Sequence, residues 1–238
     1  MTRELELLAA TAAGLGFLHA LLGPDHYLPF VLMGRAGRWS RAKTLGVTFV
    51  CGVGHVGSSL ALAGLGAALG LASARLEVIE SFRGRLAVWA LIGFGLVYFA
   101  WGLRRAARHR PHAHPHAHSN GTVHVHEHVH EAEHLHAHEA GAKITRLTPW
   151  VLFTLFIFGP CEPLIPLVLV PAAAQSVAGV ALVAAVFSVA TLTTMLAAVA
   201  VLQAGVERLP LGPLERYTHA LAGAALALCG VALQVFGL

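Results

Sequence analysis

Six long apolar blocks divide this chain and restrict what it can fold into. They cover roughly residues 5–33, 44–71, 86–103, 147–172, 177–202 and 217–238. A helix that crosses a bilayer needs about 20 predominantly apolar residues. Because the membrane interior offers no water to pair with backbone groups, only helices and closed barrels span it. The block lengths fit helices, so the sequence predicts an all-α membrane protein with six transmembrane helices.

The composition supports this class and argues against several others. Charged residues make up 12% of the chain and apolar residues 56%, whereas a soluble domain carries about 25% charged residues. The basic residues lie mainly in short connections, a pattern that sets membrane orientation and predicts no nucleic-acid partner. The chain contains no Rossmann, Walker or nucleophile-elbow motif. We therefore expect neither an enzyme nor an organic cofactor.

The distribution of Lys and Arg predicts the orientation of the chain in the membrane. Twelve of the sixteen basic residues fall in the first, third and fifth connections, and four lie on the opposite side. The twelve are Arg35, Arg38, Arg41, Lys43, Arg104, Arg105, Arg108, Arg110, Lys143, Arg146, Arg208 and Arg216, and the four are Arg3, Arg75, Arg83 and Arg85. The positive-inside rule then places both termini outside and the long third connection in the cytoplasm of a bacterial inner membrane.

The third connection is rich in histidine. Residues 109–138 hold twelve of the chain's sixteen histidines, mostly in His-x-His alternation. This pattern offers many two- and three-nitrogen sites for Zn, Ni, Co or Cu, although a solvated linker that only tolerates histidine stays open. We expect no fixed fold without metal, because the segment has little apolar content. The candidate capture residues are His112, His114, His116, His118, His124, His126, His128, His130, His134, His136 and His138.

A repeated Gly-Pro break suggests that the chain consists of two related halves. Gly23-Pro24 interrupts the first apolar block and Gly159-Pro160 interrupts the fourth. Proline lacks an N–H and clashes with the preceding turn, so each pair should break its helix. Three helices per half is an odd number, which predicts a 3+3 inverted repeat, although Gly-Pro kinks can also coincide by chance. The expected parts are residues 1–103, the His-rich cytoplasmic loop 104–146, and residues 147–238.

Polar side chains inside the apolar blocks point to a cation site. The candidate ligands are His19, Asp25, His26, His55, Cys161 and Glu162. A charged carboxylate in mid-membrane costs about 2.5–3.5 kcal/mol, and no Lys or Arg lies in the six blocks to pair with one. Nitrogen, oxygen and sulfur donors together suit first-row transition metals better than Mg or Ca. Two alternatives to a ligand role stay open. His19 would instead form a hydrogen bond to a neighbouring helix, and Cys161 would instead be a packing residue.

These residues also carry a family resemblance. The segments 19–26 and 54–55 make the chain resemble the nickel/cobalt transporter (NicO) family and the related UreH-like and TauE/SafE-like small membrane transporters. The segment 159–163 resembles the Pro-Cys segment of the transmembrane thiol-redox carriers. The resemblance covers essentially the whole chain. It implies a six-helix membrane protein, with a His-rich cytoplasmic loop between the third and fourth helices in some members, that handles metal ions.

The sequence therefore predicts a membrane transporter whose substrate is a divalent transition-metal ion of the Ni, Co, Zn or Fe class. Export is favoured over import. Because the chain has no ATP-binding motif, we expect an ion gradient to drive transport. Protons are the candidate coupling ion, since they compete with metal for the same ligands. Two alternatives stay open: an exporter of sulfite or a similar sulfur anion, and an accessory protein that delivers metal to a metalloenzyme such as urease. A homo-oligomer is compatible with all three.

Overall fold

A computed structural model describes residues 3–70, 73–108, 112–117, 123–128, 139–161, 163–173 and 176–236. Within these ranges the chain is helical apart from one short hairpin. The α-helices are α1 (Arg3–Leu22), α2 (Leu28–Ala36), α3 (Arg41–Ala68), α4 (Ser73–Arg108), α5 (Glu139–Phe158), α6 (Leu164–Ala173), α7 (Val177–Glu207) and α8 (Thr218–Phe236). Two 3-10 turns, η1 (Pro24–His26) and η2 (Gly212–Tyr217), precede α2 and α8.

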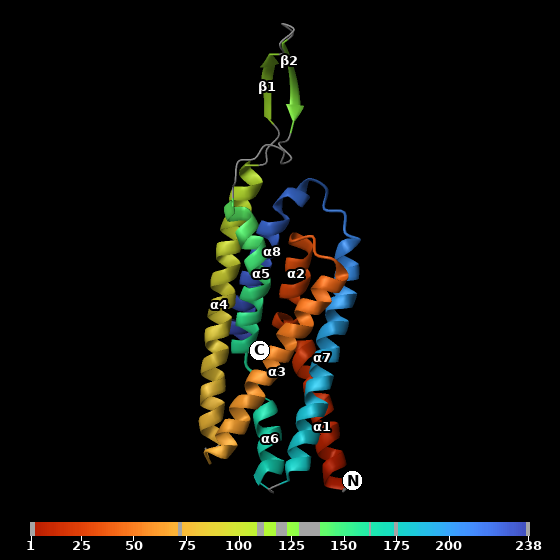
Figure 1. Ribbon diagram of the computed structural model, residues 1–238, viewed down its shortest axis with the longest axis vertical. Coiled ribbons are helices and arrows are strands. Elements are labelled where there is room, and N and C mark those ends of the chain that lie inside the picture. The colour runs from red at the N-terminus through yellow and green to blue at the C-terminus, as the bar shows by residue number, and fades with distance from the viewer. Residues whose placement is uncertain are drawn as a thin grey trace.

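The helices lie along one common axis in an elongated bundle (Figure 1). Five helical segments among the described residues are long and apolar enough to cross a membrane: Arg3–Leu22, Arg41–Ala68, Ala74–Arg108, Val177–Glu207 and Gly212–Phe236. The prediction of a helical membrane protein is thus confirmed. The first and fourth apolar blocks are each divided into two helices, and the fourth, which forms α5 and α6, contributes none of these five segments.

Both Gly-Pro pairs lie where a helix stops. Helix α1 ends at Leu22, the chain passes through Gly23 into η1, and α2 begins only at Leu28. Helix α5 ends at Phe158 and α6 begins at Leu164, so Gly159 and Pro160 fall in the gap. The two broken pairs run in opposite directions along the bundle, α1 to α2 away from the N-terminus and α5 to α6 back towards that end (Figure 1).

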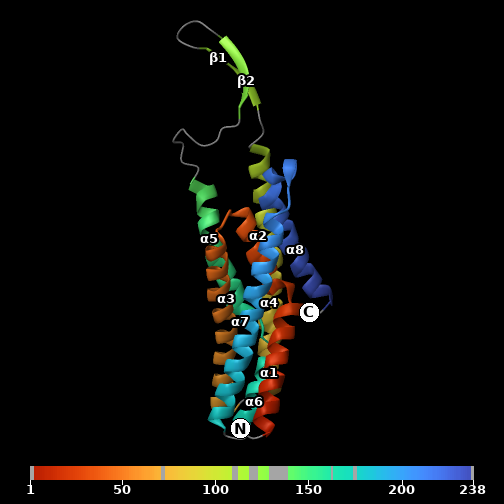
Figure 2. The same ribbon diagram turned by 90° about the vertical axis from the view of Figure 1, so that its right-hand side faces the viewer.

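Three basic connections meet at the end of the bundle opposite the N-terminus. Arg41 donates to the Glu207 carboxylate at 2.6 Å, and Arg35 donates to the Glu207 carbonyl at 3.3 Å. These contacts join the α2–α3 connection to the end of α7. The hairpin between α4 and α5 extends from the same end, while the C-terminal end of α8 lies part-way along the bundle (Figures 1 and 2).

Small residues let helices α4 and α8 approach closely. A Cβ atom on Gly223 of α8 would lie 2.3 Å from the backbone nitrogen of Phe99 on α4. Interfaces of this kind are typical of membrane helices, which associate through van der Waals packing because the lipid is as apolar as the side chains. Other residues of α4 and α8 line the cavity described below.

The described part of the His-rich loop is not irregular. Strand β1 (His112–Ala117) pairs antiparallel with β2 (Val123–His128), with His opposite His at three positions of the register. His-x-His alternation has the period of two that a strand requires. The expectation that the loop has no fixed fold without metal stays a prediction. His118, His130, His134, His136 and His138 lie outside the described residues.

Candidate metal centre

Three histidines from three elements converge inside the bundle. His19 lies in the last turn of α1, His26 ends η1, and His55 lies in the middle of α3. Nε2 of His55 is 3.5 Å from Nε2 of His19 and 3.4 Å from Nε2 of His26. One nitrogen from each ring lies within 4.8 Å of the other two, which is a spacing that one metal ion can bridge. We call His19, His26 and His55 the three-histidine cluster.

The first helix break brings two of these rings together. Seven residues separate His19 from His26, a rise of about 10 Å in an unbroken helix. In the structure their ring centroids are 4.6 Å apart. The tight turn after Gly23, where the His26 N–H donates to the Gly23 carbonyl at 3.0 Å, folds His26 back towards α1. The Gly-Pro pair thus creates a contact that helical spacing alone does not provide.

Hydrogen bonds at the far side of two rings determine which nitrogens face each other. Nδ1 of His55 donates to the Phe156 carbonyl at 3.3 Å. Nδ1 of His26 lies 3.2 Å from both the Gly23 carbonyl and an Asp25 carboxylate oxygen. With the proton on Nδ1, the Nε2 atoms carry lone pairs. Two lone pairs that point at each other across 3.4 Å repel unless a cation or a proton lies between them.

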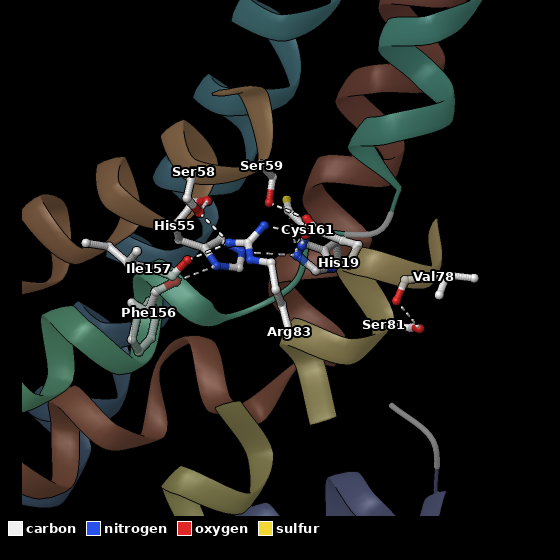
Figure 3. A network of polar contacts seen from close by, with 11 residues as sticks. His19, His55, Ser58, Ser59, Val78, Ser81, Arg83, Phe156, Ile157 and Cys161 are labelled. Carbon is white, nitrogen blue, oxygen red and sulfur yellow. Dashed lines mark hydrogen bonds and ion pairs between the residues drawn. The ribbon is translucent and has the colours of Figure 1, made fainter. Parts of the chain in front are cut away.

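The second helix break borders the same cluster. A Cβ on Gly159 would lie 3.1 Å from Nδ1 of His55, so the chain passes this ring at a distance that suits glycine. The Sγ atom of Cys161 lies 3.6 Å from Nε2 of His19, and Cys161 is fully buried. A thiol is therefore available as a fourth donor beside the three imidazoles. Figure 3 shows His19, His55 and Cys161 in this region.

The other two predicted ligands have different positions. Asp25 contacts Nδ1 of His26, and a third of its side chain is exposed. It therefore supports a ring from behind, as carboxylates commonly do around metal-ligating histidines. Glu162 lies outside the described residues. The structure thus brings together three of the six candidate ligands, with Cys161 and Asp25 at the edge of the cluster.

A cavity gives access to the cluster. It has a volume of about 280 Å³ and is lined by Asp25, His26 and His55 together with residues of α4, α5 and α8. Because a water molecule takes up about 30 Å³ in the liquid, this space can hold several waters around an ion. The Gly159-Pro160 pair also lines the cavity, so both helix breaks meet at it.

Sequence reasoning missed a buried ion pair beside the second break. Helix α4 begins before the apolar block predicted for it, so Glu80 and Arg83 are helical and face the bundle. Glu80 is fully buried and pairs with Arg83, whose side chain is 16% exposed. The six apolar blocks contain no Lys or Arg, but Arg83 lies just before the third block and reaches the site because α4 begins earlier than that block. The signal was the Glu-x-x-Arg spacing just before the apolar block, which places both side chains on one helix face.

Comparisons with protein-family models, curated proteins and solved structures found no match for this chain. The fold and the site by themselves define a helical membrane protein with a buried three-histidine cluster at the meeting point of two helix breaks.

Proposed function

We propose that the protein is a membrane transporter of a divalent transition-metal ion. The observation that carries this proposal is the convergence of three imidazoles inside an apolar bundle, with the Nδ1 atoms of His26 and His55 already engaged by acceptors. That arrangement leaves Nε2 lone pairs facing one another, and a bound cation removes their repulsion. A buried cluster of ionisable groups in a membrane is expensive, which favours a functional role over a packing role.

The donor set indicates the class of ion. Imidazole nitrogens and a neighbouring thiol suit Zn, Ni, Co or Fe(II), whereas Mg and Ca prefer oxygen donors. His19, His26 and His55 would bind the ion directly, and Cys161 stands 3.6 Å from the first of them. Asp25 would hold the His26 ring in place through its Nδ1 atom.

The two broken helices suggest how an ion would cross. If α5 and α6 count as one interrupted span, the chain has six spans, and the opposite directions of the broken pairs fit a 3+3 inverted repeat (Figure 1). Transporters with such repeats bind substrate where their discontinuous helices meet. Protons compete with metal for the same nitrogens, so a proton gradient is the natural driving force. A His-rich loop on the cytoplasmic side of a bacterial inner membrane would collect metal for export.

One observation favours a second candidate. Arg85 lines the cavity that leads to the cluster, and a fixed positive charge is what an exporter of sulfite or another sulfur anion requires. The two candidates differ in their ligand: a cation would bind the His nitrogens, whereas an anion would need Arg85.

Metal binding and flux distinguish these candidates. The full chain, with its loop histidines replaced by serine, should bind about one Co²⁺ or Zn²⁺ ion and carry it into proteoliposomes. His55→Ala should abolish both, whereas His219→Ala should change neither, because His219 bonds Tyr98 away from the cluster. Metal binding that survives in His55→Ala would refute the proposal. Sulfite flux that depends on Arg85 and persists in His55→Ala would establish the second candidate.

A further inference from the structure

A buried network of charged and hydroxyl groups connects α3, α4 and the second helix break. Glu80 pairs with Arg83, and its Oε1 atom accepts from the Ser59 hydroxyl at 2.5 Å. Arg83 donates to the Ser58 hydroxyl at 2.8 Å. Ser58 in turn donates to the His55 carbonyl at 2.9 Å, so the network reaches the backbone of the three-histidine cluster. Figure 3 shows Ser58, Ser59 and Arg83 in the region of Cys161.

The same ion pair contacts the backbone on both sides of the break. The Arg83 guanidinium donates to the Ile157 carbonyl at 2.6 Å, near the end of α5. The Glu80 carboxylate accepts from the Cys161 N–H at 3.2 Å, just before α6. A helix end leaves carbonyls without partners and a helix start leaves N–H groups without partners, and in lipid neither finds water. The Glu80 carboxylate is the acceptor for the N–H before α6, and the Arg83 guanidinium is the donor for the carbonyl at the end of α5.

We propose that Glu80 and Arg83 are positioning residues that clamp the α5–α6 break, so that Cys161 stays against the three-histidine cluster. As far as it concerns the metal, this inference rests on the proposed function. The first break depends on its own residues, because His26 bonds Gly23 and Asp25. The second break depends on α4. Movement of α4 relative to α5 would therefore be transmitted to Cys161 and to the His55 backbone.

The clamp needs the shape of arginine as well as its charge. One terminal nitrogen of Arg83 contacts Glu80, and the other contacts both Ser58 and the Ile157 carbonyl. Lysine keeps the charge but has a single nitrogen and cannot reproduce the planar fork. Arg83→Lys should therefore weaken the clamp while the carboxylate keeps a positive partner. This makes it the most informative single variant, because it leaves no unpaired buried charge.

Two measurements on full-length protein test the clamp, both in a background with serine in place of the loop histidines, Cys51 and Cys229, which leaves Cys161 as the remaining cysteine. The first is the rate at which a small maleimide labels Cys161 in detergent-solubilised protein without metal. The second is Co²⁺ affinity and the thiolate-to-cobalt absorption band. In Arg83→Lys and in the double variant Glu80→Gln with Arg83→Gln, labelling should be about tenfold faster. Cobalt affinity should fall about ten- to a hundredfold, with a weaker thiolate band.

Exposed residues of the same helix provide the controls. Glu77→Gln and Arg75→Gln remove the same charges from positions on the surface of α4 and should change neither measurement. If single variants fail to fold, the double variant carries the test, because it removes both charges together. Wild-type labelling and cobalt spectra in both Arg83→Lys and the double variant would overturn the clamp. If protein with serine in place of the loop histidines and with Glu80 and Arg83 intact binds no Co²⁺, the proposed function is refuted, yet faster labelling in the variants would still support the clamp.

Discussion

At the scale of single residues, the site depends on groups that contact the histidine rings from behind. The Asp25 carboxylate and the Gly23 and Phe156 carbonyls contact Nδ1 atoms, and Gly159 leaves room for the His55 ring. Partners of this kind fix the orientation of a ring and increase the basicity of its free nitrogen. Changes at these positions should therefore affect metal affinity without removing any ligand.

Asp25→Asn should weaken metal binding about ten- to a hundredfold, because it removes the negative charge beside Nδ1 of His26 while keeping the shape of the side chain. Isothermal titration with Zn²⁺ on protein without loop histidines measures this. Glu6→Gln, at an exposed position on α1, is the matched control. Unchanged affinity in Asp25→Asn would show that the carboxylate does not support the ring.

Gly159→Ala should also lower metal affinity. The added methyl would lie 3.1 Å from Nδ1 of His55, so the ring would have to shift by a few tenths of an ångström. We expect a loss of about tenfold in affinity, the lower end of what changes behind a ligand cause. Gly57→Ala is the control on α3, since nothing lies within 4 Å of its added methyl. Equal affinities in the two variants would contradict the prediction.

At the scale of helices, close packing of α4 against α8 holds the bundle around the cavity. A methyl on Gly223 would meet backbone atoms of Phe99, and backbone cannot move aside as the end of a side chain can. Gly223→Ala should therefore destabilise the protein by about 1–3 kcal/mol. Thermal unfolding in detergent checks this against Gly93→Ala, where nothing lies within 4 Å of the added methyl. A melting temperature unchanged in Gly223→Ala would show that these helices separate at little cost.

The hairpin between α4 and α5 should bind metal independently of the buried cluster. The backbone register of β1 and β2 pairs a histidine position with a histidine position three times. Free imidazole has a pKa of about 6.5, so protons should displace metal from the loop by about pH 5. Metal counts on full-length protein and on the variant with serine in place of the loop histidines, at pH 7 and pH 5, measure this. A variant that retains the wild-type count at pH 7 would contradict loop binding.

At the scale of the whole molecule, three basic connections lie at one end of the bundle (Figure 1). The positive-inside rule predicts that this end is cytoplasmic. A cysteine placed at Asn120, in a chain without native cysteines, should resist an impermeant thiol reagent in intact cells and react after permeabilisation. Ready labelling in intact cells would reverse the orientation and the direction of metal capture with it.

The sequence alone determined the class of protein and the places where its helices break. Apolar blocks of membrane-spanning length identify helices because backbone groups in lipid must pair within a segment. A Gly-Pro pair joins a residue of low helix propensity to one that lacks an N–H, so Gly23-Pro24 and Gly159-Pro160 were recognisable as breaks, whereas Pro149 and Pro171 lie inside α5 and α6. His19, His26 and His55 were recognisable as candidate ligands because ionisable groups in apolar blocks are costly. These are local properties, and local sequence is sufficient to reveal them.

Tertiary structure decided which of these groups meet. The contact between His55 and His26 depends on how α3 packs beside the first break, and Asp25 supports a ring because η1 turns it towards Nδ1. The Glu80–Arg83 pair was missed for the same reason: whether a charged residue next to an apolar block faces water or a neighbouring helix depends on packing. Distances between segments far apart in the chain are set by helix packing, which residue spacing within one segment does not encode.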